Sequence, residues 1–239
     1  MQFSAQAVQE TTDGNNRNAR IYVGDNQVRL EYYKGELLMA EVYDMKNRRV
    51  LLMVPQQETY LERSLPEGGM INPMLPPGDS NPCLHVPQAT CRKLAQEPLF
   101  GRDADKWEMR VKQKGRELVS LHWMDDERHM PLREQWPDGT VSELRPLGEE
   151  RLDGRPVERW EKKTTYPDGR ITLSTQWYDP ELQIAVREEL ADGKFRALRD
   201  IRVEPQPVQL FEVPAGYRQL ESIPAGATRR EPPPAPPAH

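Results

Sequence analysis

Two stretches decide the fold: GRDADKWEMRVKQKGRELVSLHWMDDERHMPLREQWPDGTVSELR at residues 101–145 and GRPVERWEKKTTYPDGRITLSTQWYDPELQIAVREELADGKFRALR at residues 154–199. They match one another in a single register once one residue is inserted. Trp107 corresponds to Trp160, and Trp123 corresponds to Trp177. Self-similarity of this kind is typical of a repeated supersecondary unit. We therefore predict that the second half of the chain is one unit written twice.

Turn signals divide each copy into four segments of strand length. Both copies contain an Asp-Gly pair before the last segment, Asp138-Gly139 in the first and Asp192-Gly193 in the second. Asp-Gly supplies the positive φ angles that tight hairpins require. Each copy is thus predicted to be a four-stranded antiparallel meander.

The first sixty residues also alternate between strand signals and turns. Val28, Leu30 and Tyr32 alternate with more polar neighbours at a period of two, which is typical of a half-buried strand. Strands are expected at residues 19–23, 28–33, 38–43 and 50–54, giving roughly ten to twelve strands in all. The predicted fold class is mainly β, a single large curved antiparallel sheet forming an open half-barrel with short helical segments.

Proline-rich segments interrupt this pattern twice. Residues 64–90 are predicted to be a covering loop, either a lid or an ordered crossover, with a helical turn near residues 69–75. Residues 90–97 suit either a short helix or the entry to a strand. Residues 223–239 are predicted to be a disordered tail. Residues 1–222 are expected to form a single domain.

Bulk composition excludes several classes of protein. The chain has 239 residues and a net charge of −5, and no basic block suggests nucleic-acid binding. No run approaches the roughly 18 apolar residues of a membrane span, so we expect a soluble protein without a transmembrane segment. No signal peptide is visible at Met1. The protein is therefore expected to be cytoplasmic, or a mature region that follows a start Met.

The two cysteines allow three interpretations. Cys83 and Cys91 can be free buried thiols, or they can form a disulfide that implies an oxidising compartment. A third interpretation adds His85 and makes the three residues metal ligands, although the spacing is irregular.

The search for catalytic motifs finds none. The chain has no phosphate-binding Gly-rich loop, no His-Glu-x-x-His helix and no Gly-x-Ser-x-Gly elbow. His122 is interpreted as a histidine on a strand face, and a hydrolase would need it to meet a nucleophile. The run Asp125-Asp126-Glu127 is interpreted as a solvated turn, because it lacks the spaced ligands of a Ca²⁺ loop. We predict no catalytic residue, no metal ligand and no cofactor.

Several motifs along the chain resemble the LolA-like superfamily of bacterial periplasmic proteins, which includes lipoprotein carriers. They cover most of residues 3–217 and are Phe3-Ser4-Ala5, Ala19-Arg20-Ile21-Tyr22-Val23, Val28-Arg29-Leu30-Glu31, Tyr60-Leu61-Glu62, Gly101-Arg102 with Trp107, Gly154-Arg155 with Trp160, Trp177-Tyr178-Asp179 and Leu210-Phe211-Glu212-Val213-Pro214-Ala215-Gly216-Tyr217.

The resemblance implies an open, strongly curved sheet whose apolar concavity holds acyl chains. It also implies export to the periplasm with the signal peptide removed, and it favours the disulfide. The expected function is a non-catalytic periplasmic protein that binds a lipid, an acyl chain or a lipoprotein. The candidate ligand-binding residues on the concave face are Leu30, Tyr32, Leu52, Trp107, Trp123, Trp160 and Trp177.

Two alternatives stay open beside this expectation. One is a protein-interaction, envelope-assembly or sensor module with an envelope protein as its partner. The other assigns the four repeated tryptophans to the scaffold, because a feature present in both copies suits a fold better than a unique site.

Overall fold

The computed structural model describes residues 1–10, 16–65, 79–84, 86, 88–113 and 115–221. The strands of the N-terminal half are β1 (Phe3–Glu10), β2 (Asn16–Val23), β3 (Gln27–Lys34), β4 (Leu37–Asp44), β5 (Arg49–Val54) and β6 (Thr59–Ser64). The strands that follow are β7 (Thr90–Leu99), β8 (Arg102–Gln113), β9 (Arg116–Asp125), β10 (Pro131–Gln135), β11 (Val141–Leu152), β12 (Arg155–Thr165), β13 (Ile171–Asp179), β14 (Ile184–Glu189), β15 (Phe195–Val203) and β16 (Arg218–Gln219). Two short 3₁₀ helices, η1 (Pro55–Gln57) and η2 (Val208–Phe211), complete the described elements.

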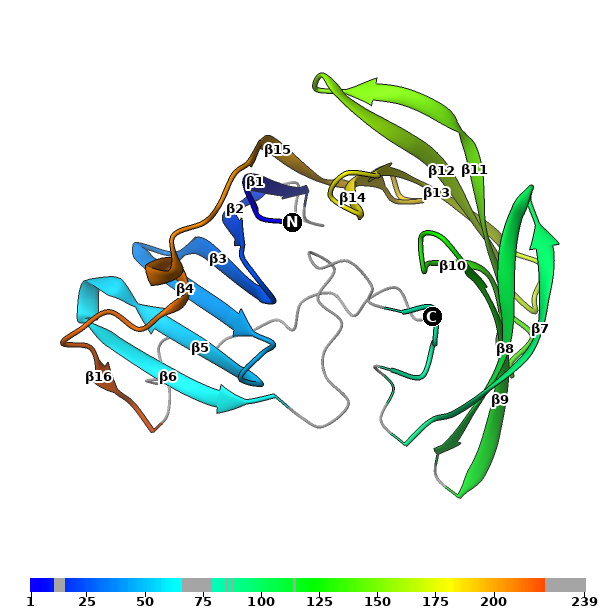
Figure 1. Cartoon of the computed structure of the whole chain (residues 1–239), viewed down its shortest axis with the longest axis horizontal. Coiled ribbons are helices and arrows are strands. Elements are labelled where there is room, and N and C mark those ends of the chain that lie inside the picture. The colour runs from blue at the N-terminus through cyan, green and yellow to red at the C-terminus, as the bar shows by residue number, and fades with distance from the viewer. Residues whose placement is uncertain (11–15, 66–78, 85, 87, 114, 222–239) are drawn as a thin grey trace.

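All sixteen described strands belong to one sheet, in the order β16-β6-β5-β4-β3-β2-β1-β15-β14-β13-β12-β11-β10-β9-β8-β7. The pairing of β1 with β15 joins the N-terminal strands to the second half. Every pair is antiparallel except β16 with β6. Figure 1 shows the sheet curving into an open C, with β2–β6 on one arm and β7–β13 on the other. The predicted fold class, a single open and curved antiparallel sheet, is confirmed.

The predicted strand number was too low. The sequence pattern missed β1, β6 and β16, and it left β7 undecided between helix and strand. β7 has the sequence TCRKLAQEPL, which is rich in good helix formers. Its pairing with β8 along most of its length overrides that local preference.

The internal repeat is confirmed as two four-stranded meanders, β8–β11 and β12–β15. The structure adds a third copy of its central turn, between β4 and β5. In all three turns a fully buried aspartate accepts a hydrogen bond from the backbone N–H three residues later. The pairs are Asp44 with Asn47, Asp125 with Arg128 and Asp179 with Leu182, at 3.0, 2.6 and 3.0 Å. The next residue in each turn has positive φ, namely Arg48, His129 and Gln183.

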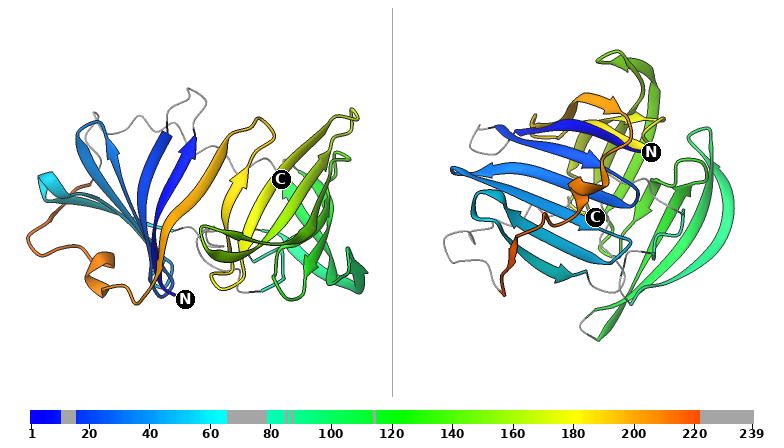
Figure 2. Two further views of the ribbon diagram at one scale, coloured as in Figure 1. Left: turned by 90° about the horizontal axis from the view of Figure 1, so that it is seen from above. Right: turned by 60° about the vertical axis from the view of Figure 1, so that its left-hand side comes forward.

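Buried apolar side chains form three clusters along the sheet. One cluster joins β1–β3 to β12–β15 and includes Phe3 and Ile184. A second packs around Trp160 in the other arm. The third lies between β4, β5 and the segment that follows β15, where Phe211 is buried. Figure 2 shows this segment, with η2, crossing the outside of the N-terminal arm.

Several predictions fall on residues that are not described. The tail at residues 223–239, the helical turn near residues 69–75 and much of the loop at residues 64–90 lie outside the described ranges. The single-domain assignment of residues 1–222 stays a prediction. The described residues include no helix with the length and apolarity that a membrane crossing requires.

Candidate functional site

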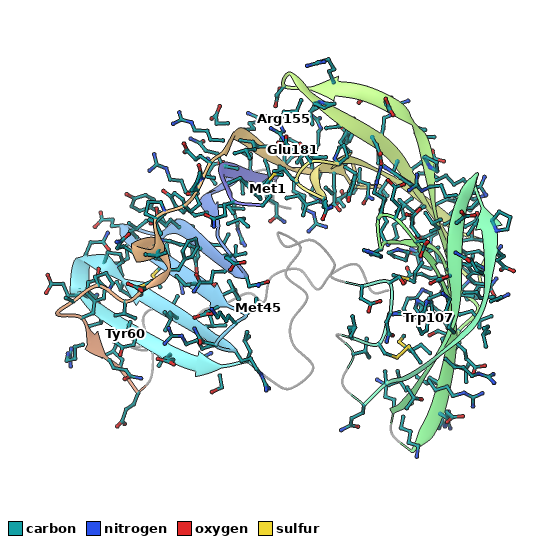
Figure 3. All side chains as sticks on the ribbon, viewed as in Figure 1. Met1, Met45, Tyr60, Trp107, Arg155 and Glu181 are labelled. Carbon is teal, nitrogen blue, oxygen red and sulfur yellow. A yellow bond between two sulfur atoms is a disulfide. The ribbon has the colours of Figure 1, made fainter. Side chains whose placement is uncertain are left out.

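The strand register divides the side chains of the sheet between two faces. Residues opposite one another in antiparallel strands share a face, and side chains alternate along each strand. One face can be followed through Leu30–Ile21, Ile21–Ala5, Ala7–Leu198, Arg196–Glu188, Glu188–Gln176, Gln176–Trp160, Lys162–Leu144, Ser142–Glu134, Glu134–His122 and His122–Trp107. Figure 3 shows Trp107 on the side of β8 that is turned toward the interior of the C. We call this the inner face, and the opposite one the outer face.

Five of the seven candidate ligand-binding residues lie on the inner face. Leu30 and Leu52 are both opposite Glu41, so they share its face, and Tyr32 lies two residues beyond Leu30. Trp107 and Trp160 belong to the same face through the register. The structure thus brings apolar side chains from both arms onto one surface. Ligand binding by these side chains stays a prediction.

The register puts Trp123 and Trp177 on the outer face, so it does not bring them together with the other five candidates. Both still belong to buried clusters that include inner-face residues, Trp123 with Trp160 and Trp177 with Ile21, and their part in ligand binding stays a prediction. Each is opposite an arginine, Arg133 or Arg187. The guanidinium carbons lie 5.3 and 5.2 Å from the centres of the two indole rings. Both rings are buried under these charged side chains, in agreement with a scaffold role.

A carboxylate lies within the apolar inner face of the N-terminal arm. Glu41 is buried, and its two oxygens accept hydrogen bonds from the hydroxyls of Tyr32 and Tyr43 at 2.6 and 2.8 Å. Burying a carboxylate is costly unless hydrogen bonds compensate. The tyrosine pair supplies that compensation and fixes the orientation of both rings.

The other arm carries a chain of three buried polar groups on the same face. Ser120 Oγ lies 2.8 Å from His122 Nε2, and His122 Nδ1 lies 3.3 Å from Glu134 Oε1. The ring of Trp136 meets the imidazole edge-on, with centres 5.2 Å apart. The sequence did not predict this arrangement, because its members come from two strands. It places a hydroxyl beside an imidazole, as serine hydrolases do.

One carboxylate couples the two repeat copies. Glu158 Oε1 lies 2.7 Å from Arg128 Nη2, and Glu158 Oε2 accepts a hydrogen bond of 3.3 Å from the indole N–H of Trp160. The hydrogen bond to Glu158 raises the pKa of Arg128. Burial raises the pKa of the nearby Tyr178 to about 12. Trp160 is therefore held by a partner that is itself fixed by a charge.

The disulfide between Cys83 and Cys91 is confirmed, with eight positions separating the two residues. It anchors the end of the Pro-rich segment to the beginning of β7, where Cys91 is opposite Met109. The metal interpretation of these cysteines is wrong, because both sulfurs are used in the bridge.

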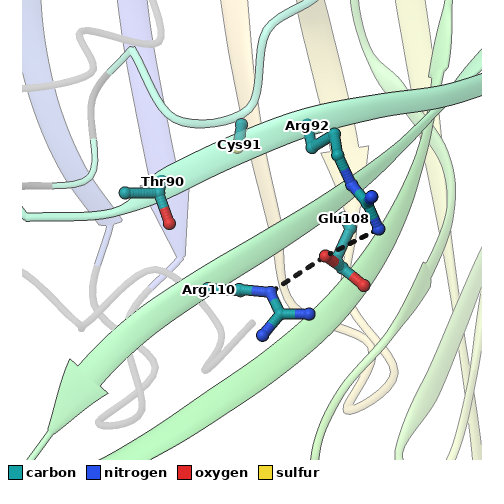
Figure 4. Close-up of a pocket in the computed structure, with 5 residues that line it drawn as sticks. All are labelled: Thr90, Cys91, Arg92, Glu108 and Arg110. Atoms are coloured by element: carbon teal, nitrogen blue, oxygen red, sulfur yellow. Dashed lines mark hydrogen bonds and ion pairs between the residues drawn. The ribbon is translucent and has the colours of Figure 1, made fainter.

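A shallow hollow of about 310 Å³ lies beside the bridge, lined by Thr90, Cys91, Arg92, Glu108 and Arg110. Figure 4 shows Glu108 between the two arginines, with Arg110 Nε at 2.9 Å and Arg92 Nη2 at 3.4 Å from its Oε1. The hydrogen bond from Arg110 lowers the pKa of Glu108. Glu108 is opposite Leu121 and belongs to the outer face. The hollow is polar and distinct from the apolar surface.

The comparisons with known proteins concern the fold. No protein-family model and no curated protein matches the chain. It is similar to the structure of an uncharacterized conserved protein from Thermus thermophilus, with 11% identity, coverage of 92% of this chain and 90% of that chain, and a TM-score of 0.32. It is also similar to a LolA superfamily protein from Nitrosomonas europaea, with 13% identity, coverage of 88% and 89%, and a TM-score of 0.36.

A third similar structure is the hypothetical lipoprotein YmcC from Escherichia coli (K12), with 11% identity, coverage of 86% and 85%, and a TM-score of 0.31. The matches thus include the superfamily that the sequence resembles. At these identities and TM-scores they carry no argument about function, which rests on the geometry of this chain.

Proposed function

We propose that the protein binds an acyl chain of a lipid or lipoprotein on its inner face and that it does so in the periplasm. The observation that carries this proposal is the gathering of Leu30, Tyr32, Leu52 and Trp107 on one face of an open, curved sheet. Ligand sites are typically concave and apolar, with a few polar groups that fix orientation. The inner face is concave and carries apolar residues on both arms, with polar residues such as Glu188 and Gln176 between them.

The energetics suit an acyl chain. Burying one methylene contributes about 0.8 kcal/mol, so a chain needs contact along much of its length to bind firmly. Leu30 and Leu52 lie on the N-terminal arm, and Trp107 lies on the other arm. A long flexible chain can contact both arms, whereas a small compact ligand contacts one.

The periplasmic location is supported by the Cys83–Cys91 bridge. Disulfides persist in oxidising compartments and are rare in the cytosol. Export is therefore part of the proposal, together with the removal of a signal peptide.

The proposed binding is not coupled to catalysis, despite the contact between Ser120 and His122. Ser120 lies inside the regular ladder between β8 and β9, where it is opposite Met109. Backbone N–H groups in a ladder donate to the neighbouring strand, so they are not free to stabilise an oxyanion. Both imidazole nitrogens already have side-chain contacts. The trio therefore suits a buried polar network.

A second candidate function is recognition of an envelope protein at the sheet edge. Strand β7 is ten residues long, mostly exposed, and within the described residues it pairs only with β8. An extended peptide can add to such an edge by main-chain hydrogen bonds. Charged side chains and the bulge near Lys93 oppose such pairing, so acyl binding is the better-supported function.

Native mass spectrometry of the gently purified protein tests the proposal. We expect a population heavier than the polypeptide by the mass of one lipid, and we expect organic extraction to remove that mass. A spectrum of the bare polypeptide alone, together with no uptake of added lipid, would overturn the proposal. Capture of an envelope protein through β7 without any bound lipid would favour the second candidate.

A further inference from the structure

One position on the inner face holds an aspartate in the first repeat copy and a glutamate in the second. Asp105 and Trp107 in the first copy correspond to Glu158 and Trp160 in the second. Each pair lies two residues apart on one strand, so both side chains point to the same face. The carboxylate of the first copy is one methylene shorter. The two copies can therefore be compared as a natural substitution of Glu by Asp.

In the second copy the carboxylate serves two partners. Glu158 binds Arg128 through one oxygen and accepts the indole N–H of Trp160 through the other. Trp160 is almost completely buried, at 1% exposure. Both carboxylate oxygens and the indole N–H have intramolecular partners, so this group offers nothing to a ligand.

In the first copy the carboxylate of Asp105 contacts a lysine but not the indole of Trp107. Lys93 Nζ lies 2.6 Å from Asp105 Oδ2, as Arg128 lies against Glu158. The other oxygen, Asp105 Oδ1, is buried without a hydrogen-bond partner among the described residues. The same holds for the indole Nε1 of Trp107. The shorter side chain thus leaves one buried acceptor and one buried donor unmatched.

Unmatched buried polar groups destabilise a fold and are rare in native structures. Asp105 is only 3% exposed, whereas Trp107 is half-buried. Three other indoles donate to glutamates, Trp123 to Glu97, Trp177 to Glu150 and Trp160 to Glu158. Trp107 is the exception, on the face proposed to bind an acyl chain.

We propose that Asp105 and Trp107 form the polar anchor of this acyl-chain site and that they bind a neutral hydroxyl group on the ligand. The indole N–H of Trp107 donates to the hydroxyl oxygen, and the hydroxyl donates to Asp105 Oδ1. A hydroxyl is both donor and acceptor, so it satisfies both groups. A carboxylate cannot donate, so it leaves Asp105 Oδ1 without a donor. The ligand class is therefore an acyl ester of a polyol, such as a monoacylglycerol, and not a free fatty acid.

This inference rests on the proposed function, and its test separates the two. The ligands are 1-decanoylglycerol and decanoate, which share one acyl chain, and each competes with the fluorescent apolar probe N-phenyl-1-naphthylamine. We expect the wild-type protein to prefer 1-decanoylglycerol by about tenfold, the effect of roughly one well-placed hydrogen bond. Failure of the wild-type protein to bind the probe or either ligand overturns the proposed function itself.

Two variants assign the preference to the anchor. Trp107→Phe removes the donor and keeps an aromatic ring, and Asp105→Glu restores the carboxylate of the other copy and so supplies Trp107 with an internal partner. Both are expected to bring the preference within about twofold of unity while probe binding is kept. Trp123→Phe is the matched control on the outer face, and it should keep the full preference.

The indole ¹H–¹⁵N resonances give a second readout that does not depend on variant stability. The Trp107 signal, assigned by its loss in Trp107→Phe, should move on addition of 1-decanoylglycerol, while the Trp123 and Trp177 signals stay in place. A preference that persists in both anchor variants, or a Trp107 signal that ignores bound 1-decanoylglycerol, overturns the inference and leaves acyl binding intact. The second outcome means that only water satisfies the two groups.

Discussion

Arg155 lies across the turn from Asp179, with its Nε 2.6 Å from Oδ2 of that fully buried carboxylate. Arg102 and Asp125 form the corresponding pair in the first copy. The other oxygen of Asp179 accepts backbone N–H bonds from Glu181 and Leu182. One aspartate thus closes the turn and binds the arginine that begins the copy.

Asp179→Ala should therefore lower the free energy of unfolding by about 3 kcal/mol, because it leaves two backbone donors unpaired and leaves Arg155 only the exposed Glu181 as a partner. Asp168→Ala is the control, since that aspartate is exposed and lies 3.8 Å from an exposed Arg170. A surface pair of this kind contributes less than about 1 kcal/mol. Urea unfolding followed by tryptophan fluorescence measures both, and equal losses would contradict the assigned role.

Acid should destabilise the fold through two of the three turn aspartates, Asp44 and Asp125. Burial alone raises the pKa of Asp125, but hydrogen bonds from Arg102 and from the backbone N–H of Arg128 outweigh burial and leave that pKa below its ordinary value. The pKa of Asp44 is lowered in the same way, chiefly by Asn47 against the effect of burial. A lowered folded-state pKa gives stability that is present above the unfolded-state value, about 3.9, and is lost below it.

The free energy of unfolding should hence be nearly constant from about pH 7 to pH 5 and fall below about pH 4. Asp125→Asn should lower it at neutral pH and make the fall in acid shallower, since one of the titrating groups is gone. Urea titrations at several pH values from about pH 7 to below about pH 4 measure the free energy of unfolding of both proteins. An Asp125→Asn curve parallel to the wild-type curve would show that Asp125 does not contribute.

The repeat and the turn residues made much of this fold predictable. Trp107, Trp160 and the Asp-Gly pairs predicted two meanders, and the structure has β8–β11 and β12–β15. The third copy of the turn escaped notice because Asp44 is followed by Met45 and Lys46, with none of the tryptophans that mark the other copies. Its equivalence to Asp125 lies in backbone geometry, which residue matching does not detect.

The site was predicted less completely than the fold. Period-two alternation placed Leu30 and Tyr32 on one face, but the face of Trp123 depended on a register that passes through several strands. The contact between His122 and Glu134 likewise comes from pairing of β9 with β10. Such cross-strand relations need the register, and one sequence supplies it only near tight turns.

The disulfide gives a direct prediction about stability. Replacing Cys83 and Cys91 by serine together should lower the free energy of unfolding by about 2–3 kcal/mol, because the bridge closes a short loop in the unfolded chain. The wild-type protein should show no free thiol before reduction and two after it. Two free thiols in the native protein would remove both this effect and the support for export.

Ser120 should be inert toward a fluorophosphonate probe. Its hydroxyl contacts His122, but the surrounding ladder leaves no oxyanion donors from the backbone. Intact-protein mass spectrometry after incubation should therefore show no adduct, and Ser142→Ala and Ser120→Ala should behave like the wild-type protein. An adduct that forms on the wild-type protein and disappears only in Ser120→Ala would mean that the inner face is catalytic.

The central claim is that the inner face binds an apolar chain, and two strands of one arm allow a matched test. Leu52 lies on the inner face, whereas Tyr33 lies on the outer face and is 71% exposed. A new carboxylate opposes apolar binding only where the ligand lies, since an unpaired charge is costly to bury. Circular dichroism confirms beforehand that Leu52→Glu and Tyr33→Glu are folded.

The decisive measurement is the titration of N-phenyl-1-naphthylamine into the wild-type protein, Leu52→Glu and Tyr33→Glu. The account predicts at least about tenfold weaker binding in Leu52→Glu, corresponding to roughly 1.4 kcal/mol, and unchanged binding in Tyr33→Glu. Equal binding by the two variants, or weaker binding in Tyr33→Glu alone, would contradict a site on the inner face.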